Sequence, residues 1–290
     1  MTQFFDNFHI GEEAAGGLSA GIVGTVIGFP LDLIKTRMQT GKTLGQTNLL
    51  RVGSQIVKKE GFFALYKGIG PPLLSLSILN TLSFTSYAYF RELYGGRNGW
   101  DVVNGLAGMT GAPMFGIVST VENMVKTQMQ VDNTSKRRFS SSWQCVKTLS
   151  KEHGVTVLYT GHLVNTIREA AFTCCYFFVY EGYREMLIEG TNDAKMAVPI
   201  AGGLAGATSW TFSFPLDCLR AGVQGRDLTR EKRKGAMEVF NELWRTKGIR
   251  GLYSGVGPSI ARAFLVSSSR FSAYEGALWL VRGGRDVGSR

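Results

Sequence analysis

Long apolar segments alternate with short polar ones along the chain, and the same order occurs three times. Segments with few charges span 12–39, 100–130 and 197–224, and a second set of apolar segments spans 71–94, 162–187 and 257–281. Amphipathic stretches lie between them at 51–60, 142–152 and 235–247. Each apolar segment exceeds the roughly 20 residues that a helix needs to cross a bilayer. The pattern predicts an all-α membrane protein with six transmembrane helices and a short polar helix within each pair.

Two phrases recur with one period and divide the chain into repeats. Gly-x4-Tyr-x-Gly begins at Gly61, Gly154 and Gly248, which are 93 and 94 residues apart. Ahead of each copy, the first set of apolar segments ends on Pro30-Leu-Asp-Leu-Ile-Lys, then Val121-Glu-Asn-Met-Val-Lys, then Pro215-Leu-Asp-Cys-Leu-Arg. Two independent landmarks with the same spacing indicate tandem copies of one module. We place the three copies at 1–97, 98–192 and 193–290, together forming one transmembrane domain.

Small residues recur at fixed places ahead of the second phrase. Each odd-numbered helix carries a pair of small residues four positions apart: Gly17 and Gly21, Gly108 and Ala112, Gly202 and Gly206. This spacing puts both members on one helix face, where neighbouring backbones can approach closely in lipid.

These residues resemble the mitochondrial carrier family over nearly the whole chain. The matching motifs are Pro-x-[Asp/Glu]-x-x-[Lys/Arg] at the end of each odd-numbered helix and Gly-x4-aromatic-x-Gly after each short helix. The resemblance implies six tilted helices with threefold pseudosymmetry around one central site in the mitochondrial inner membrane, with the short helices on the matrix side. It also implies transport by alternating access to the two sides of the membrane.

The charged residues of the second phrase are expected to form a ring that closes the matrix side. Charges at this depth are costly unless they are paired. The family pattern pairs Asp32 with Lys126 and Asp217 with Lys35, whereas Asn123 stands where the third acid is expected. The ring therefore lacks one of three bridges, and Gln128 lies near enough in sequence to add a hydrogen bond. The predicted matrix gate comprises Asp32, Lys35, Asn123, Lys126, Gln128, Asp217 and Arg220.

A second ring is expected where the even-numbered helices end. The family motif there is aromatic-[Asp/Glu]-x-x-[Lys/Arg], and only the second module carries it in full, as Tyr180-Glu181-x-x-Arg184. The first module keeps the base Arg91 without the acid, and the third keeps the acid Glu275 without the base. At most two bridges can form in this cytoplasmic gate of Arg91, Glu181, Arg184 and Glu275.

The repeat also locates a substrate site. Arg168 and Arg262 each lie 12 residues before the tyrosine of the cytoplasmic motif, and Ser75 takes this place in the first module. Twelve residues are about 18 Å along a helix, so these side chains share one level inside the membrane. Glu169 adjoins Arg168. A buried structural Arg-Glu pair is the alternative to a ligand-binding role.

The charges of this level suit a zwitterion. Arginine presents a planar fork of donors for a carboxylate or phosphate, and Glu169 offers an acceptor for a cation. Ile167-Arg168-Glu169 resembles the contact pair of the carnitine/acylcarnitine and ornithine/basic amino-acid carriers. Leu79 stands where the ornithine type has an acid, which favours a substrate with one positive centre. The predicted site comprises Ser75, Leu76, Leu79, Asn80, Arg168, Glu169 and Arg262.

Three functions remain open from the sequence. The first is exchange of a carnitine-like or amino-acid-like zwitterion, with basic amino acids still candidates. The second is transport of a carboxylate metabolite, in which Glu169 only orients Arg168. The third is a degenerate, non-exchanging, uncoupler-like or scaffold protein, which the weakened second module suggests. An enzyme has little support. The chain has only three histidines, for each of which a structural or solvated role is the simpler interpretation, and it lacks a Gly-rich phosphate loop in a strand-turn-helix context.

The net charge of +10 falls in short basic clusters between apolar segments. This distribution suits anionic lipid headgroups and no nucleic acid. The family binds cardiolipin around its short helices, where Gly68, Gly161 and Gly255 precede the even-numbered helices. Backbone N–H groups at a helix start attract anions. We expect a monomer without cofactor or metal.

Overall fold

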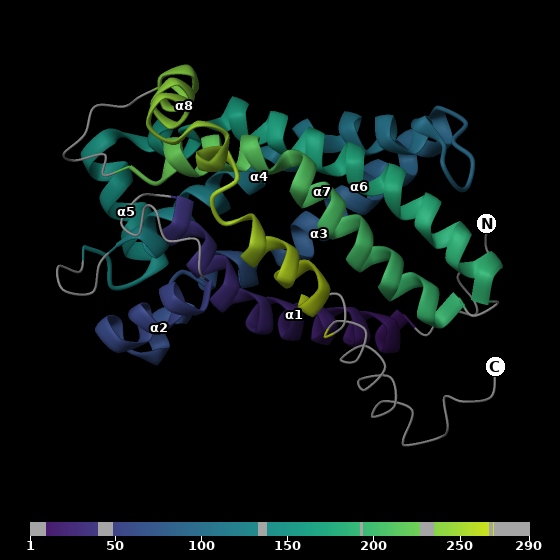
Figure 1. Cartoon of the computed structure of the whole chain (residues 1–290), viewed down its shortest axis with the longest axis horizontal. Helices are drawn as coiled ribbons and strands as arrows, with labels where there is room; N and C mark the ends of the chain where they lie inside the picture. Colours follow the sequence, from purple (N-terminus) through teal and green to yellow (C-terminus); the bar gives the residue numbers. More distant parts are fainter. Residues whose placement is uncertain are drawn as a thin grey trace.

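A computed structural model describes residues 10–39, 49–132, 138–191, 194–226, 235–266 and 269. Long helices run side by side along the longest axis (Figure 1). They are α1 (Ile10–Gln39), α3 (Gly70–Leu93), α4 (Val102–Val131), α6 (His162–Thr191), α7 (Ala194–Gln224) and the described start of a last helix at 256–266. The predicted all-α architecture is confirmed, and the helices begin within a few residues of the predicted positions.

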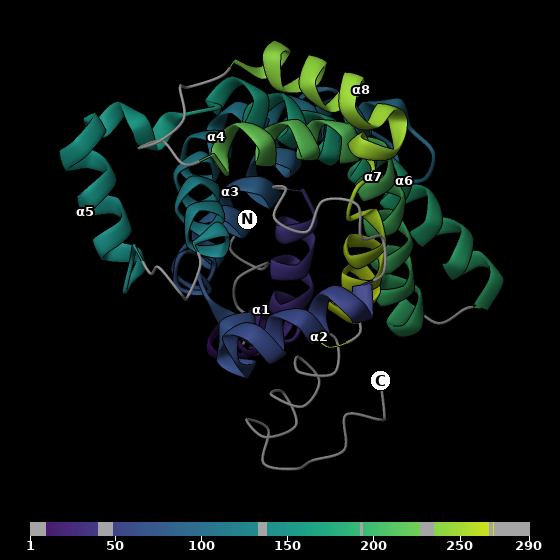
Figure 2. The same ribbon diagram turned by 60° about the vertical axis from the view of Figure 1, so that its left-hand side comes forward.

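The short helices gather at one end of the bundle. These are α2 (Leu49–Glu60), α5 (Ser142–His153) and α8 (Ala236–Leu252), and all three lie at the left in Figure 1. Figure 2 shows them spread around that end rather than stacked on one another. Each module thus contributes a first long helix (α1, α4 or α7, the odd-numbered transmembrane helices), one short helix at this end, and a second long helix that returns (α3, α6 or the last helix, the even-numbered transmembrane helices).

The long helices close into a ring. Helix α3 contacts α1 and α4, α4 contacts α6, and α6 contacts α7. A side chain at Gly206 of α7 would come within 3.2 Å of Ala263 in the last helix. Arg262 of that helix in turn reaches Asp32 of α1. The ring therefore returns to its beginning, and both faces of every module meet a neighbour.

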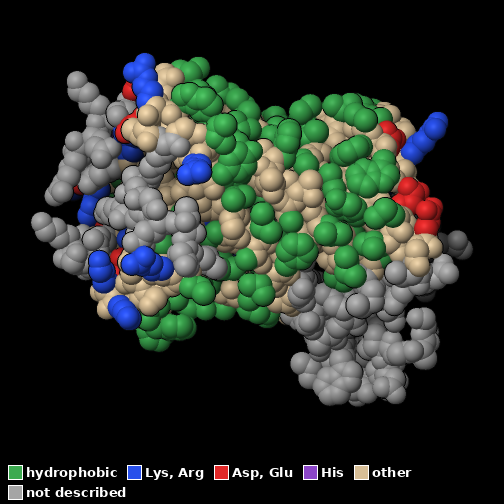
Figure 3. Space-filling model, viewed as in Figure 1, with side chains coloured by type: hydrophobic (Ala, Val, Ile, Leu, Met, Phe, Trp, Pro, Cys, Tyr) green, Lys and Arg blue, Asp and Glu red, His purple; other side chains and the backbone are tan. Residues whose placement is uncertain are grey.

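The outer face of the ring is apolar and the interior carries polar side chains. In Figure 3 hydrophobic side chains cover the middle of the molecule, and most Lys and Arg side chains in view lie at the end with the short helices. The exposed set includes Ile22 and Ile27 on α1 and Leu106 and Ile117 on α4. Such a wide exposed apolar surface suits contact with lipid.

Length and composition alone single out one described helix, α4, as able to cross a membrane. The other long helices carry more charge or a lower mean hydropathy because their inner faces line the polar interior. Ionisable groups in membrane helices face the bundle interior in this way, which explains the mean hydropathy of +0.02 for the whole chain.

Both glycines of the repeated Gly-x4-Tyr-x-Gly phrase have a positive φ angle in every module, a conformation that glycine adopts without steric cost. The φ angles are 86°, 78° and 58° at Gly61, Gly154 and Gly248, and 90°, 74° and 92° at Gly68, Gly161 and Gly255. Short 3₁₀ helices at Phe62–Tyr66 and Val155–Tyr159 fill the first two copies. The phrase is a double turn that leads the chain from each short helix back into the bundle.

The second glycine of the phrase also packs against the next module. A Cβ atom would lie 3.0 Å from Met129 Cβ at Gly68, 3.2 Å from Val223 Cγ1 at Gly161, and 3.3 Å from the Lys35 carbonyl oxygen at Gly255. Each contact joins an even-numbered helix start to the end of the following odd-numbered helix, and the third contact returns to the first module. The phrase is therefore an intermodule joint.

Small residues bring α4 and α6 close together within the second module. A Cβ atom at Gly108 would lie 2.6 Å from Phe177 Cδ2 and 2.8 Å from the carbonyl oxygen of Thr173. The Thr173 hydroxyl donates to the Gly108 carbonyl oxygen at 3.0 Å. The backbones are in contact here, as the small-residue spacing predicts.

Gly108→Ala is expected to lower the thermal unfolding midpoint of the detergent-purified protein, because the new methyl group meets backbone that cannot move aside. Overpacking of this kind costs about 1–3 kcal/mol. Gly190→Ala on α6 is the matched control, since nothing lies within 4 Å of its added Cβ. That control is expected to leave stability unchanged or to raise it through helix propensity. Equal midpoints for the two variants would contradict the close α4–α6 contact.

Candidate functional site

Two buried ion pairs join the modules near the short-helix end. Lys126 Nζ on α4 lies 2.7 Å from Asp32 Oδ2 on α1. Lys35 Nζ on α1 lies 2.8 Å from Asp217 Oδ2 on α7, and the side chains of this second pair are only 6% and 0% exposed. The structure therefore contains both pairs that the family pattern implied.

The third position of this ring has a different set of contacts. Arg220 Nη2 binds Asp217 Oδ1 of its own helix at 3.1 Å, and its Nη1 donates to Gln224 Oε1 at 3.0 Å. Asn123 donates from Nδ2 to Asn165 Oδ1 at 3.3 Å, inside its own module. Within the described residues no ion pair joins the second module to the third at this level.

Hydrogen bonds join the second and third modules at the place where no ion pair does so among the described residues. Gln128 Nε2 on α4 donates to the carbonyl oxygens of Gln224 and Arg226 at 2.6 and 2.8 Å. Gln224 Nε2 donates in turn to the carbonyl oxygen of Thr160 at 3.2 Å. Amide side chains therefore link the second and third modules where the other two contacts use charges.

Sequence reasoning missed two residues of the ring. Gln39 Nε2 donates to Asp217 Oδ2 at 2.8 Å, beside Lys35. Gln39 lies four residues after the base of its motif, and Gln130 and Gln224 take the same place in the other modules, so the repeat could have revealed it. Trp210 lies under the Lys35 ammonium, with 3.7 Å between Nζ and the ring centroid. This is a close cation–π contact.

The predicted substrate level lies directly against this ring. Arg262 Nε is 2.9 Å from Asp32 Oδ1, without the alignment of a hydrogen bond. Arg168 Nη2 contacts Glu169 Oε1, and its guanidinium carbon lies 6.0 Å from the Trp210 ring centroid. Arg262 thus reaches from the third module to the first, and Arg168 from the second to the third.

Ser75 takes the equivalent position in the first module and reaches the second. Its hydroxyl donates to a carboxylate oxygen of Glu122 on α4, and it also contacts the Pro71 carbonyl oxygen at 2.9 Å. Leu79 is partly buried on α3. The side chains of Leu76 and Asn80, which complete the predicted site, lie outside the described residues.

Arg168 has unused hydrogen-bonding capacity. Its side chain is 8% exposed, and its Nε atom is buried without a hydrogen-bond partner among the described residues. A buried donor left unpaired costs free energy. A bound carboxylate or phosphate would satisfy it.

The opposite end of the bundle has weaker intermodule contacts. The Tyr87 hydroxyl on α3 donates to Glu181 Oε1 on α6 at 3.3 Å, and the Tyr87 ring stacks on Phe177 at 3.7 Å. Glu181 also pairs with Arg184 of its own helix at 3.4 Å. Arg91 binds elsewhere, donating to Asn104 and Asn98 at 2.9 and 2.7 Å, and Glu275 lies outside the described residues. Among the residues described here, ion pairs between modules occur only at and next to the short-helix end.

Comparison with known proteins decides the family. The model of the family described as mitochondrial carrier protein matches residues 6–98, 101–191 and 194–282. The chain belongs to the mitochondrial carrier family. It is therefore a multi-pass transporter of the mitochondrial inner membrane with a small-molecule substrate, and not an enzyme. The carrier fold also supports the prediction of six transmembrane helices, five of which the structure describes over most of their length.

Similar carriers cover nearly the whole chain. Mitochondrial substrate carrier family protein L of Dictyostelium discoideum is 30% identical over 90% of this chain and 92% of its own length. The mitochondrial arginine transporter BAC2 of Arabidopsis thaliana is 29% identical over 92% and 90%. A mitochondrial carnitine/acylcarnitine carrier-like protein of the same plant is 27% identical over 91% and 96%.

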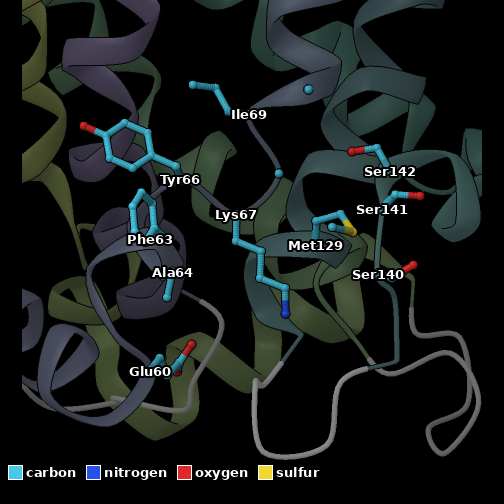
Figure 4. A pocket seen from close by; sticks show the side chains of 12 residues that line it. Glu60, Phe63, Ala64, Tyr66, Lys67, Ile69, Met129, Ser140, Ser141 and Ser142 are labelled. Atoms are coloured by element: carbon cyan, nitrogen blue, oxygen red, sulfur yellow. The ribbon is translucent and has the colours of Figure 1, made fainter.

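A pocket of about 400 Å³ lies outside the bundle, at the start of α3. Figure 4 shows Tyr66, Ile69 and Ser140–Ser142 around it. The N-termini of α3 and α5 both lie at this pocket. Pro71 and Pro72 of α3 lack N–H groups, so the N–H groups that attract an anion here come from Gly70 and the start of α5. Lys67 also lines the pocket, and its ammonium pairs with Asp132 at 2.9 Å. Gly68 lines the pocket.

Asp217→Asn is expected to lower the thermal unfolding midpoint strongly, since Lys35 and Arg220 would then share a buried site without their carboxylate. Breaking a buried pair in this way costs about 3–5 kcal/mol. Glu242→Gln is the control, because Glu242 is 47% exposed in its pair with Arg226. Exposed pairs contribute about 0–1 kcal/mol. A similar decrease of the unfolding midpoint in both variants would contradict the stabilising role of the buried ion pairs.

Proposed function

We propose that this carrier exchanges a small zwitterion, either carnitine-like or amino-acid-like, with basic amino acids among the candidates. The observation that carries the proposal is the pairing of arginine and carboxylate at one level of the bundle interior. Arg168 and Arg262 offer guanidinium forks for a substrate carboxylate. Glu169 lies beside Arg168 and offers an acceptor for the positive centre.

The related carriers support this substrate class. By their names, one transports arginine and another is carnitine/acylcarnitine carrier-like. Arginine and carnitine both carry a carboxylate and at least one positive centre. The identities of 29% and 27% leave the choice between them to experiment.

A specific contact favours the carboxylate-metabolite alternative. Glu169 already binds Arg168, as expected if the glutamate only orients the arginine. In that case Glu169 would not need to touch the substrate, and a dicarboxylate could bind the two arginines.

Thermal unfolding with a substrate panel separates these functions. A ligand that binds only the folded protein raises the midpoint by mass action. Carnitines or amino acids are expected to give the shift, and Glu169→Gln is expected to remove it, because the positive centre loses its carboxylate. A shift with malate that is indifferent to Glu169→Gln would favour the carboxylate carrier. Absence of any shift from a folded sample would favour a non-exchanging protein.

We further propose that the short-helix end is the matrix gate and that the structure has this gate closed. Asp32, Lys35, Lys126 and Asp217 supply the intermodule ion pairs, Arg220, Asn123 and Gln128 complete the ring, and Gln39 braces it. The cytoplasmic gate would form from Arg91, Glu181, Arg184 and Glu275 when the bundle closes at its other end.

Asn123→Asp is expected to slow exchange in preloaded liposomes. By the threefold repeat, an acid at this position faces Arg220 as Asp32 faces Lys126, so the substitution strengthens the closed gate. A hydrogen bond between charged groups contributes about 1.5–3 kcal/mol, which corresponds to slowing by roughly ten- to a hundredfold. The same substitution in an Arg220→Gln background is the control, where no slowing is expected. Unchanged or faster exchange by Asn123→Asp alone would contradict the third-bridge account.

The external pocket at Gly68 is our proposed cardiolipin site, with related positions at Gly161 and Gly255. The N-terminus of α5 together with the Gly70 N–H at the start of α3 suits a phosphate headgroup, and the basic end of the molecule in Figure 3 would lie in the same anionic lipid surface. The ring closes within one chain, which supports a monomeric carrier.

A further inference from the structure

Glu122 lies in the interior of the bundle, although its position in the repeated motif is not one of those that supply the predicted gate residues. It occupies the variable place of the second module's phrase, between Val121 and Asn123. Successive residues of an α-helix point about 100° apart, so Glu122 and Asn123 face different neighbours. The Glu122 carboxylate meets Ser75 on α3, whereas Asn123 meets Asn165 on α6.

Ion pairs already occupy the other carboxylates at the ring and at the predicted substrate level. Asp32 holds Lys126 and Arg262, and Asp217 holds Lys35 and Arg220. Glu169 holds Arg168. Glu122, by contrast, has no Lys or Arg within ion-pair distance in the described part of the chain, and its contact is the neutral Ser75 hydroxyl.

The first module supplies Glu122 with a neutral hydroxyl rather than a cation. Ser75, Arg168 and Arg262 are equivalent positions, and each reaches the following module. Arg262 meets the acid Asp32 there, whereas Ser75 offers a neutral hydroxyl to Glu122. Glu122 lies one place before Asn123, the equivalent of Asp32. The charges of Glu169, Asp32 and Lys126 all act on Glu122, so it shares one electrostatic environment with the substrate level. A carboxylate at this depth calls for a positive partner.

We propose that Glu122, held by Ser75, binds a second positive centre of the substrate, so that the carrier selects dibasic amino acids. This inference rests on the proposed zwitterion transport. The substrate carboxylate binds Arg168 or Arg262, the α-ammonium lies near Glu169, and the distal ammonium or guanidinium binds Glu122. Leu79 on α3 stands where ornithine-type carriers have an acid, and Glu122 on α4 would supply that acid instead. Glu122 is a specificity-determining residue and belongs to neither gate.

Arginine and citrulline form a matched pair of probes for this site. They share the carboxylate, the α-ammonium and the chain length, and they differ in a charged guanidinium against a neutral urea group. The purified wild-type protein is expected to bind arginine at least about tenfold more tightly than citrulline, because charge-assisted hydrogen bonds are the stronger class. Affinities are obtained from the ligand dependence of the unfolding midpoint.

Three variants identify the residue responsible. Glu122→Gln keeps a hydrogen bond to Ser75 and is expected to weaken arginine about tenfold while leaving citrulline nearly unchanged. Glu122→Asp keeps the charge and is expected to retain most of the arginine preference. Glu169→Gln is expected to weaken both ligands alike, since both carry the α-ammonium. Unfolding without ligand verifies that each variant is folded.

The outcomes separate this inference from the function on which it rests. Equal binding of arginine and citrulline by the wild-type protein, or equal weakening of both by Glu122→Gln, would overturn the role of Glu122. Binding of carnitine or neutral amino acids without arginine would do the same and leave zwitterion transport standing. If no zwitterion binds the folded protein, the proposed function fails as well.

Discussion

The arrangement of the bundle depends on pairing charges that would otherwise be buried alone. Asp32, Lys35 and Asp217 lie on inner helix faces with at most 7% of each residue exposed. Such groups are tolerated in a membrane only with partners, and their partners are on neighbouring modules. The ion pairs therefore select which of the long helices α1, α4 and α7 meet at the short-helix end, because another arrangement would leave buried charge without compensation.

The same rule of neighbours recurs at three levels of the structure. At the ring, an acid of one module meets the base of the next. At the joint of each Gly-x4-Tyr-x-Gly phrase, the second glycine packs on the following odd-numbered helix. At the predicted substrate level, Ser75 and Arg262 each contact a carboxylate of the following module. A ligand that bridges two of these contacts therefore touches two or more modules and senses how they are arranged.

Much of this could be predicted because it follows from the repeat. The helix order comes from motifs with one period, the pairs of Asp32 with Lys126 and Lys35 with Asp217 were implied by the resemblance to the carrier family, and Gln39 was accessible from its spacing. Trp210 has no aromatic counterpart, since Thr25 and Gly116 take its place in the other modules. Glu122 required the orientation of α4 against α3, a tertiary contact that neither local propensity nor the motif specifies. Trp210 and Glu122 thus escaped prediction because they depart from threefold symmetry, whereas Gln39 follows the repeat and was overlooked.

Departure from symmetry also suggests how binding is coupled to the gate. Arg262 is a proposed substrate ligand and at the same time a partner of Asp32, which already holds Lys126. A substrate carboxylate on Arg262 would compete with Asp32 and weaken the contact between the third and first modules. Reversing a 1:99 population takes about 5.5 kcal/mol of differential binding, whereas a charged hydrogen bond contributes only about 1.5–3 kcal/mol. The contact between the second and third modules has no ion pair to break in the described part of the chain. If the substrate also competes with Asp32 for Arg262, the free energy needed to open the proposed gate becomes small enough for the binding of one small substrate to supply.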